Sequence, residues 1–536
     1  IDTQWTRVKG GAPIGKAIEK IIDDFDFSAP FKSVVPLLEV KSMILELQDN
    51  HWKSVKIEEV DTLILNCLGM ELQFNANMPY GVLGEDLQIK VLINNPSPLN
   101  VSLKQIKYED KLHDLNQPLQ ANVLFKKNFN TKVSGAISSP YWLIQKGSQG
   151  MYTTEKTEWI GAAKSPAPYL AELSFSIEGK KLKIGLPLQY RRTDPVRGEV
   201  VTPFHILPQA GLELEAPVIL FAPNQSQKVK VSVKNLGPSL SGTLKLETPK
   251  SWELSPKSIQ VDITSKGNQS DFYFNIKAPL EAAVGYLKPI LQTPTTKIQA
   301  SLREIAYNHI PKQYLVSPAQ SKVVALNLKK GVEKVAYIEG AGDNIPQSLS
   351  AVGVDVEILK AKDITLKKLN PFDAVITGIR AFNIEESLAY KNKILWEYAS
   401  TGGNLLIQYN TTRRLKTKQL SPLSLNLSRD RVSDESAYVQ IINPKHPILS
   451  HPNKITAQDF DGWVQERGLY FPNQWDEQFI PLLQMNDTGE SPKKGALLVA
   501  NYGKGRVVYT GLSFFRQLPA GVPGAYRLFF NLIARP

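Results

Sequence analysis

Residues 228–238 read KVKVSVKNLGP, in which Val229, Val231 and Val233 alternate with Lys and Ser. A period of two is typical of a strand with one buried face and one solvated face. The pattern stops at Asn-Leu-Gly-Pro, a turn signal. The same design occurs far upstream in residues 87–96, LQIKVLINNP. Short strands of this kind, separated by Gly, Pro and Asn turns, predict two immunoglobulin-like β-sandwiches, over residues 70–200 and 201–310.

Residues 1–69 have the period of helices. Behind Pro13 the apolar side chains recur at helical spacing, at Ile14, Ala17, Ile18, Ile21, Ile22 and Phe25. Similar stripes predict a second helix that carries residues 37–47 and a third that carries residues 57–68, capped by Gly69. Three short helices with one apolar stripe each bury little on their own, so we expect this segment to pack on a larger body.

Residues 311–536 alternate apolar strands with helical patterns. Strands are expected at 334–338, 354–359, 374–376 and 405–408, after a linker near 310–322. Helices are expected at 345–352 and at 383–400, where Asn383 and Glu386 form a capping-box signature. Residues 496–500 and 506–510 flank a hairpin turn. Strand–helix–strand alternation predicts a mainly parallel sheet, with ligands at the carboxyl ends of its strands.

Charge and cysteine content exclude several functions. The 63 basic and 51 acidic residues give a net charge of +12, but the basic residues are scattered doublets that alternate with apolar residues. This is typical of solvated strand faces and does not favour nucleic-acid binding. One cysteine, Cys67, excludes a disulfide framework and a Cys-rich zinc module. Its place on a helix stripe predicts a buried structural thiol. No apolar run approaches the roughly 20 residues of a membrane span.

Motifs for phosphate, metal or serine chemistry are absent from the sequence. GxxxxGK[ST], HExxH and GxSxG do not occur, and residues 340–342 are a lone GxG with Ile345 where a dinucleotide fingerprint needs Gly. His446 and His451 each precede Pro and lie five positions apart, so they do not share a helix face. We therefore predict no metal site and no cofactor in this chain.

One acidic and aromatic cluster stands out in the last third of the chain. Asp459, Asp461 and Glu466 lie close in sequence to Trp463, Arg467 and Tyr470. Two neighbouring carboxyl groups are able to do general acid–base work, provided that the fold brings them together. The competing interpretation is a surface loop that Trp463 anchors. Both interpretations stay open at this point.

Tyr141 and Trp142 form a second candidate binding feature. They follow Ser139-Pro140, and their rings are suited to stacking on a sugar. The competing interpretation is a buried anchor between the first sandwich and its neighbour.

Several segments resemble a known family. They are Ser139-Pro140-Tyr141-Trp142-Leu143, Lys146-Gly147, Gly150-Met151-Tyr152, residues 190–199 (YRRTDPVRGE) and the opening Ile1-Asp2-Thr3-Gln4-Trp5 with Gly10-Gly11. Together they look like large bacterial proteins of the PIG-L/LmbE deacetylase family. The resemblance implies a zinc-dependent N-acetylglucosaminyl deacetylase domain first, then β-sandwiches, then a glutamine-amidotransferase-like α/β domain. The second sandwich, at about 205–305, also resembles the NEW3 module found beside glycosidase domains.

The chain departs from that family at both catalytic sites. The family's zinc site needs an A/P-H-P-D-D segment and a distant H-x-x-H, whereas His446-Pro447 continues into Ile448 and His451-Pro452 into Asn453. Zinc is therefore expected only in a catalytic domain that is missing from this chain. An amidotransferase needs a thiolate on the turn after a central strand. The strand at 405–408 runs into Tyr409 and Asn410, so this nucleophile position is degenerate.

These observations predict a multidomain α+β chain. We expect a helical segment (1–69) that docks on the missing catalytic domain, two immunoglobulin-like sandwiches (70–200 and the NEW3-like 201–310) and a flavodoxin- or amidotransferase-like α/β domain (311–536). The expected function is that of the non-catalytic accessory portion of a secreted, periplasmic or extracellular bacterial deacetylase of N-acetylated sugars. Its expected partners are the deacetylase domain, another envelope protein or a glycan. One alternative is a carbohydrate-active hydrolase that uses Asp459, Asp461 or Glu466, and another is a structural subunit of a cell-envelope complex.

Overall fold

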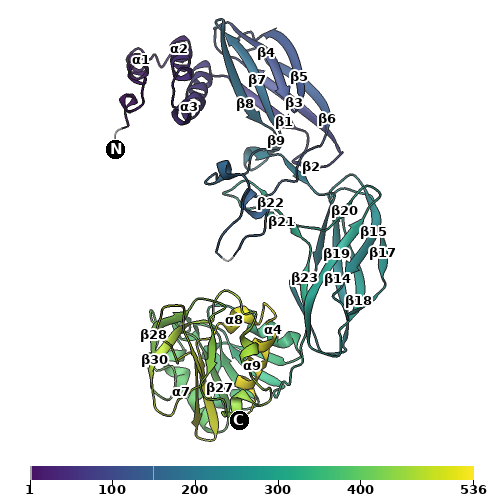
Figure 1. Ribbon diagram of the computed structural model, residues 1–536, viewed down its shortest axis with the longest axis vertical. Coiled ribbons are helices and arrows are strands. Elements are labelled where there is room, and N and C mark those ends of the chain that lie inside the picture. Colours follow the sequence, from purple (N-terminus) through teal and green to yellow (C-terminus); the bar gives the residue numbers. More distant parts are fainter. Residues whose placement is uncertain (1–2, 149, 536) are drawn as a thin grey trace.

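The computed structural model describes residues 3–148 and 150–535, so Ile1 and Asp2 of the family-like opening lie outside the described residues. Figure 1 shows an elongated arrangement in which the N-terminal helices lie beside the first sandwich at one end, the second sandwich lies in the middle, and a sheet flanked by helices lies at the other end. The prediction of a multidomain chain with N-terminal helices and sandwich-like sheets is confirmed. Among the described residues, no helix is long and apolar enough to cross a membrane.

The N-terminal helices are α1 (Ala12–Asp23), α2 (Val34–Leu45) and α3 (Asn50–Leu68). Asp49 caps α3 by accepting a hydrogen bond from the Trp52 amide, and Gly69 ends it in the left-handed conformation at φ 66°. An ion pair of 2.6 Å between Lys41 of α2 and Asp61 of α3 joins two helices. The apolar residues of this segment continue into the core of the first sandwich.

The first sandwich has two facing sheets. One has the order β10-β9-β1-β3-β6 and the other the order β5-β4-β7-β8. The bounds are β1 Glu71–Ala76, β3 Asp86–Asn94, β4 Val101–Tyr108, β5 Lys111–Pro118, β6 Phe125–Lys132, β7 Leu170–Ile177, β8 Lys180–Pro187, β9 Gln189–Asp194 and β10 Gly198–Pro203. Between β6 and β7 the chain makes a long excursion that contains the short helices η3 (Tyr141–Leu143) and η4 (Thr157–Trp159).

The second sandwich contains the opening KVKVSVKN stretch as its strand β14. Val229, Val231 and Val233 are fully buried there, as the alternation predicts. Its sheets have the orders β12-β14-β18-β16 and β13-β23-β19-β15-β17, with β20 on β19. The bounds are β12 Ala210–Leu214, β13 Val218–Phe221, β14 Ser226–Asn235, β15 Leu240–Glu247, β16 Glu253–Ser255, β17 Ser258–Ile263, β18 Gln269–Lys277, β19 Ala283–Gln292, β20 Lys297–Ile298 and β23 Ser321–Ala325.

The predicted linker at 310–322 is wrong. This stretch contains β22 (Gln313–Pro318), which pairs with β21 (Ala300–Ile305), and it runs into β23. Strand β23 lies between β13, which it pairs in parallel, and β19. The strand completes a sheet in which its partner β13 lies more than a hundred positions upstream, since Val218 pairs with Lys322. A local turn signal carries no information about such pairing.

The C-terminal part is built on a seven-stranded sheet with the order β25-β24-β26-β27-β34-β33-β31. The five strands from β25 to β34 are parallel and β33 and β31 are antiparallel to their neighbours. The bounds are β24 Lys334–Ile338, β25 Asp355–Leu359, β26 Ala374–Thr377, β27 Asn404–Gln408, β31 Ile480–Pro481, β33 Leu497–Tyr502 and β34 Gly505–Thr510.

Helices cover both faces of this sheet. Residues of α4 (Ile345–Ala351) and α9 (Pro523–Ile533) share one core with one face of the strands. Residues of α7 (Leu388–Ser400) share a second core with the other face. The strands are therefore buried on both sides, which explains their continuous apolar sequence.

The capping box predicted at Asn383 and Glu386 does not form. Asn383 ends up inside a short helix, α6 (Ala381–Ile384), and α7 starts only at Leu388. The Asn383 amide instead donates hydrogen bonds to the carbonyl oxygens of Thr411 (3.0 Å) and Arg413 (2.9 Å). These long-range bonds satisfy the side chain, so it does not serve as a local cap.

Candidate functional site

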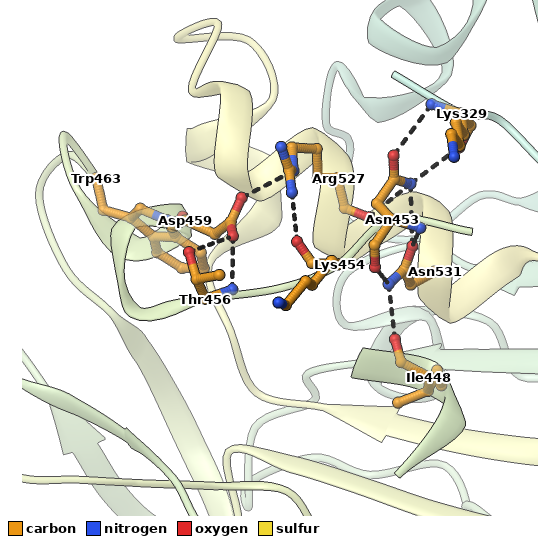
Figure 2. A network of polar contacts seen from close by, with 9 residues as sticks. All are labelled: Lys329, Ile448, Asn453, Lys454, Thr456, Asp459, Trp463, Arg527 and Asn531. Atoms are coloured by element: carbon orange, nitrogen blue, oxygen red, sulfur yellow. Dashed lines mark hydrogen bonds and ion pairs between the residues drawn. The ribbon is translucent and has the colours of Figure 1, made fainter. Parts of the chain in front are cut away.

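Asp459 of the acidic cluster lies in a loop that packs against α9, where Figure 2 shows it beside Arg527. Asp459 belongs to the short helix η7 (Ala457–Phe460) and is 7% exposed. Its Oδ2 accepts hydrogen bonds from the Thr456 amide (2.7 Å) and hydroxyl (3.2 Å). The amide bond, together with the bond that the Asp459 amide donates to the Thr456 side chain, makes a capping box. Oδ1 of Asp459 pairs with Nε of Arg527 on α9 at 3.0 Å. Both carboxylate oxygens are thus engaged by the protein itself.

Trp463 anchors this loop. Its ring is 3% exposed and packs against Phe460 and Phe514, with centroids 5.7 and 5.8 Å away. Its indole N–H donates to the Asp459 carbonyl oxygen at 3.0 Å. The geometry matches the interpretation of Trp463 as a loop anchor.

Arg467 lies beside the same ring, with its guanidinium carbon 5.8 Å from the Trp463 centroid. It is 5% exposed and donates to the carbonyl oxygens of Ala437 (3.0 Å) and Phe460. Burial lowers the pKa of the guanidinium, while the carboxylates of Asp434, Asp461 and Glu435 oppose that shift. Arg467 therefore holds the Trp463 loop to the segment at 434–437.

The two other acids take different surroundings. Asp461 is exposed. Glu466 is bound through Oε1 to Nε of Arg516 at 2.8 Å. Asp459 and Glu466 are thus each engaged by an arginine, whereas a glycosidase needs two carboxyl groups that face the substrate.

Tyr470 and the degenerate nucleophile position meet at the carboxyl end of β27. The rings of Tyr409 and Tyr470 are stacked, with centroids 6.3 Å apart and an interplanar angle of 7°. Phe515 lies 5.4 Å from Tyr409. Burial raises the pKa of the Tyr409 phenol, so it stays protonated. Asn410 is fully buried, accepts from the Phe382 amide (2.9 Å) and donates to the Gln408 carbonyl (2.9 Å). Asn410 therefore ties two loops of the sheet edge together.

A polar group next to this edge was missed by the sequence analysis. Tyr337, at the end of β24, donates its hydroxyl proton to the carboxylate of Asp343 at 2.7–2.8 Å. The Gln408 amide donates to the same hydroxyl at 3.1 Å. The loops that follow β24 and β26 also approach each other closely, because a Cβ on Gly340 would meet the Ile379 carbonyl oxygen at 2.1 Å. Polar residues in the last positions of the buried strands β24 and β27, and in the loop after β24, were the available signal for this group.

Tyr141 and Trp142 differ in their burial. Tyr141 is 7% exposed, and its amide donates to the Ser165 hydroxyl at 2.9 Å. Its ring makes edge-to-face contacts with Trp142 and Trp159, at 4.9 and 6.0 Å. Tyr141 is placed as a buried anchor of the excursion between β6 and β7, whereas Trp142 is half-buried.

Two concave surfaces were also missed by the sequence analysis. The first, the helical groove, has a volume of about 580 Å³ and is lined mainly by apolar side chains of α1, α2 and α3 and the turn after α1. Cys67 lines it and is half-buried, and burial raises the pKa of its thiol. The groove forms where the apolar stripes of the three helices are not covered by another part of the chain. Helical periodicity in the sequence does not reveal which part of a stripe stays uncovered.

The second surface, the polar cleft, has a volume of about 310 Å³. Its floor is a pair of short antiparallel strands, β29 (Val439–Ile441) and β32 (Leu483–Met485). Its walls come from residues 434–438 and 486–488. The two sequence segments are far apart in the chain, so the cleft exists only in the fold.

His446 and His451 do not assemble a metal centre. Nδ1 of His446 accepts a hydrogen bond from the Ile448 amide at 3.3 Å, and burial lowers the pKa of its imidazole. Within the described residues, no group of three or more His, Cys, Asp or Glu side chains is arranged to hold a metal ion.

Comparison with known proteins yields remote likenesses only. No family model matches the chain, and no curated protein matches it. Similar solved structures include E. coli α-2-macroglobulin (11% identity, 48% of this chain, 17% of that chain, TM-score 0.18) and an exo-β-1,4-mannosidase from an Opitutaceae bacterium (11% identity, 37% and 35%, TM-score 0.23). Red sea bream transglutaminase is another (12% identity, 51% and 34%, TM-score 0.21). The chain thus spans between a sixth and about a third of the length of these three proteins.

Proposed function

We propose that this chain is the accessory portion of a secreted PIG-L-like, zinc-dependent deacetylase that acts on N-acetylated sugars. In this proposal the chain positions the catalytic domain and binds a glycan or a partner, and zinc belongs to the catalytic domain. The work takes place in the periplasm or outside the cell. The single observation that carries the proposal is the helical groove.

The groove is an apolar surface that is open to solvent. Phe27 is 91% exposed, Ile22 66% and Leu63 50%, and all three line it. Large apolar side chains gathered at one concave surface mark a contact site in soluble proteins. Ile18, Ile21 and Phe25 lie half-buried on the same side. A protein surface that covers this groove removes all of them from water.

The groove is built on a firm base. Leu37, Val40 and Ile44 of α2 form its floor and are at most 6% exposed. The Lys41–Asp61 ion pair fixes α2 against α3. A surface that is already formed in the free protein loses little conformational entropy on binding. The helices therefore suit a permanent contact with a neighbouring domain, which in this proposal is the deacetylase domain.

The C-terminal part fits the proposal as a flavodoxin- or amidotransferase-like α/β domain without a nucleophile. Its parallel strands and its two helical layers support that class. Asn410, which stands just after the central strand β27, has both polar atoms of its side chain in use within the fold. In this proposal the second sandwich is the NEW3-like module.

The hydrolase alternative is not favoured by the geometry. It requires two carboxyl groups that face a common space. Asp459 is occupied by Thr456 and Arg527, and Glu466 by Arg516.

The proposal is tested by measuring the affinity between this chain and a PIG-L-like catalytic domain encoded with it or beside it. Binding in solution is followed by calorimetry or sedimentation. We expect association that Leu63→Glu in the groove weakens at least about tenfold, because the new carboxylate is buried unpaired. Leu280→Glu is the matched control, since Leu280 is 77% exposed and lies outside the groove.

Two results would overturn the proposal. One is the absence of any deacetylase domain encoded with or next to this chain. The other is association that Leu63→Glu and Leu280→Glu leave equally strong. If a different envelope protein binds through the groove instead, the result supports the alternative that the chain is a structural subunit of a cell-envelope complex.

A further inference from the structure

The polar cleft carries groups that recognise hydroxyl-rich ligands. Gln440 of β29 and Gln484 of β32 are direct partners in the strand pair, and their amides are hydrogen-bonded to each other at 3.1 Å. Asn486 adds a third carboxamide to the lining. A carboxamide offers a donor and an acceptor side by side, which suits the neighbouring hydroxyl groups of a sugar.

Tyr438 adds an aromatic face. Its side chain is 75% exposed at the edge of the cleft, although its neighbours Ala437 and Val439 are buried. An exposed aromatic ring beside polar groups gives a ligand one apolar face and one hydrogen-bonding face. The two faces of a pyranose ring offer the same combination.

The charged side chain that lines the cleft is Asp434. Its carboxylate accepts hydrogen bonds from the Ser436 amide (2.8 Å) and hydroxyl (2.6 Å). These bonds, with a smaller contribution from Arg467, lower the pKa of Asp434, so the group is ionised at neutral pH. A fixed negative charge disfavours phosphates, sulfates and acidic sugars and accepts hydrogen bonds from neutral hydroxyl groups.

The cleft is also rigidly held. Asp487 accepts hydrogen bonds from the amides of Ser433 and Asp434, at 2.9 Å each, and so joins the two walls. Below them Arg467 holds the Ala437 carbonyl at 3.0 Å. Its volume of about 310 Å³ is at the lower end of the range of small-ligand sites, about 300–1,000 Å³.

We propose that the polar cleft is a binding subsite for a neutral saccharide, with Tyr438 stacking on a sugar ring and Gln440, Gln484 and Asn486 binding its hydroxyl groups. The inference deepens the glycan binding of the proposed function and assigns it to residues other than Tyr141 and Trp142. It does not depend on the helical groove.

The test is a titration of the whole chain with three probes: a neutral glucose tetrasaccharide, an N-acetylglucosamine tetramer and a sulfated heparin tetrasaccharide. Ligand-observed NMR and calorimetry report binding. We expect at least one neutral probe to bind and the sulfated probe to bind more weakly. Tyr438→Ala should weaken binding about tenfold or more, and Tyr438→Phe should keep most of it, because stacking needs the ring alone.

Tyr390→Ala is the matched control, because Tyr390 is 68% exposed on α7 and does not line the cleft. Three results would overturn the inference: no binding of either neutral probe, stronger binding of the sulfated probe, or equal effects of Tyr438→Ala and Tyr390→Ala. Leu63→Glu should leave sugar binding unchanged, so a failure of docking and a failure of sugar binding are told apart.

Discussion

Replacing Asp459 best distinguishes between a structural and a catalytic role of the loop that contains it. In the structure its carboxylate caps η7 through Thr456 and pairs with Arg527 on α9. Asp459→Ala removes both interactions at once. A catalytic acid behaves in the opposite way, because active-site groups are commonly held at a cost in stability and their removal is neutral or stabilising.

The expected loss follows from these contacts. Removing a capping side chain costs about 1 kcal/mol. Loss of the ion pair adds about 1–2 kcal/mol, less than for a fully buried pair, because the Arg527 side chain is 33% exposed. We therefore expect Asp459→Ala to lower the free energy of unfolding of the C-terminal part by about 2–3 kcal/mol, or its Tm by about 4–12 °C.

Calorimetry of the full chain measures this loss, and amide exchange in peptides covering 456–467 assigns it to the loop. Asp461→Ala is the matched control, since Asp461 is exposed two positions away, and its effect should stay within about 0.5 kcal/mol. In a double-mutant cycle, Asp459→Ala and Arg527→Ala should couple by about 1 kcal/mol. A stability that Asp459→Ala leaves unchanged or raises would refute the structural account of this loop.

Three further predictions concern other parts of the chain. Gly524→Ala should destabilise α9 by about 2 kcal/mol or more, because its Cβ would meet the Asp459 carbonyl oxygen at 2.0 Å, and calorimetry checks this; an unchanged Tm would contradict that packing. Lys41→Met should lower the free energy of unfolding by about 2–3 kcal/mol at pH 7, because it leaves the Asp61 carboxylate unpaired. The loss should be smaller at pH 5, because burial already raises the pKa of Asp61 and the carboxylate then takes up a proton. Urea unfolding measures both values, and an equal loss at the two pH values would contradict this prediction. Burial lowers the pKa of His205 below its usual value of 6.5, so as the pH drops the unfolded chain protonates this imidazole before the folded chain does. The free energy of unfolding should therefore fall as the pH drops below about 6.5. His205→Gln should flatten this part of the stability–pH profile, and an equal slope in both proteins would contradict the prediction.

Local pattern was sufficient where one face of an element is buried. The alternation at Val229, Val231 and Val233 predicts β14 and its buried side, because side chains on a strand alternate by geometry alone. Pro13 and Gly69 likewise mark the start of α1 and the end of α3. Each of these features depends on a few neighbouring residues, so it can be predicted from the local sequence.

Features that join distant segments were not predictable in this way. Strand β22 and the first residues of β23 fall in the segment predicted as a linker, because local pattern does not reveal the pairing of β23 with β13 and β19. Asp459, Asp461 and Glu466 form a cluster in the sequence, but arginines on separate elements hold Asp459 and Glu466. The polar cleft combines Asp434 and Tyr438 with Gln484 across a strand pair, and no local period signals such a surface. The domain boundaries and the family remain predictions.

The proposed function requires the helical groove to be the docking face for a deacetylase domain. Hydrogen–deuterium exchange of this chain, alone and in the presence of that domain, tests it most directly. We predict slower exchange in peptides covering 18–27 and 56–67, together with unchanged exchange in the second sandwich. Equal exchange in these peptides with and without the domain, under conditions in which the two proteins are bound, would contradict the claim.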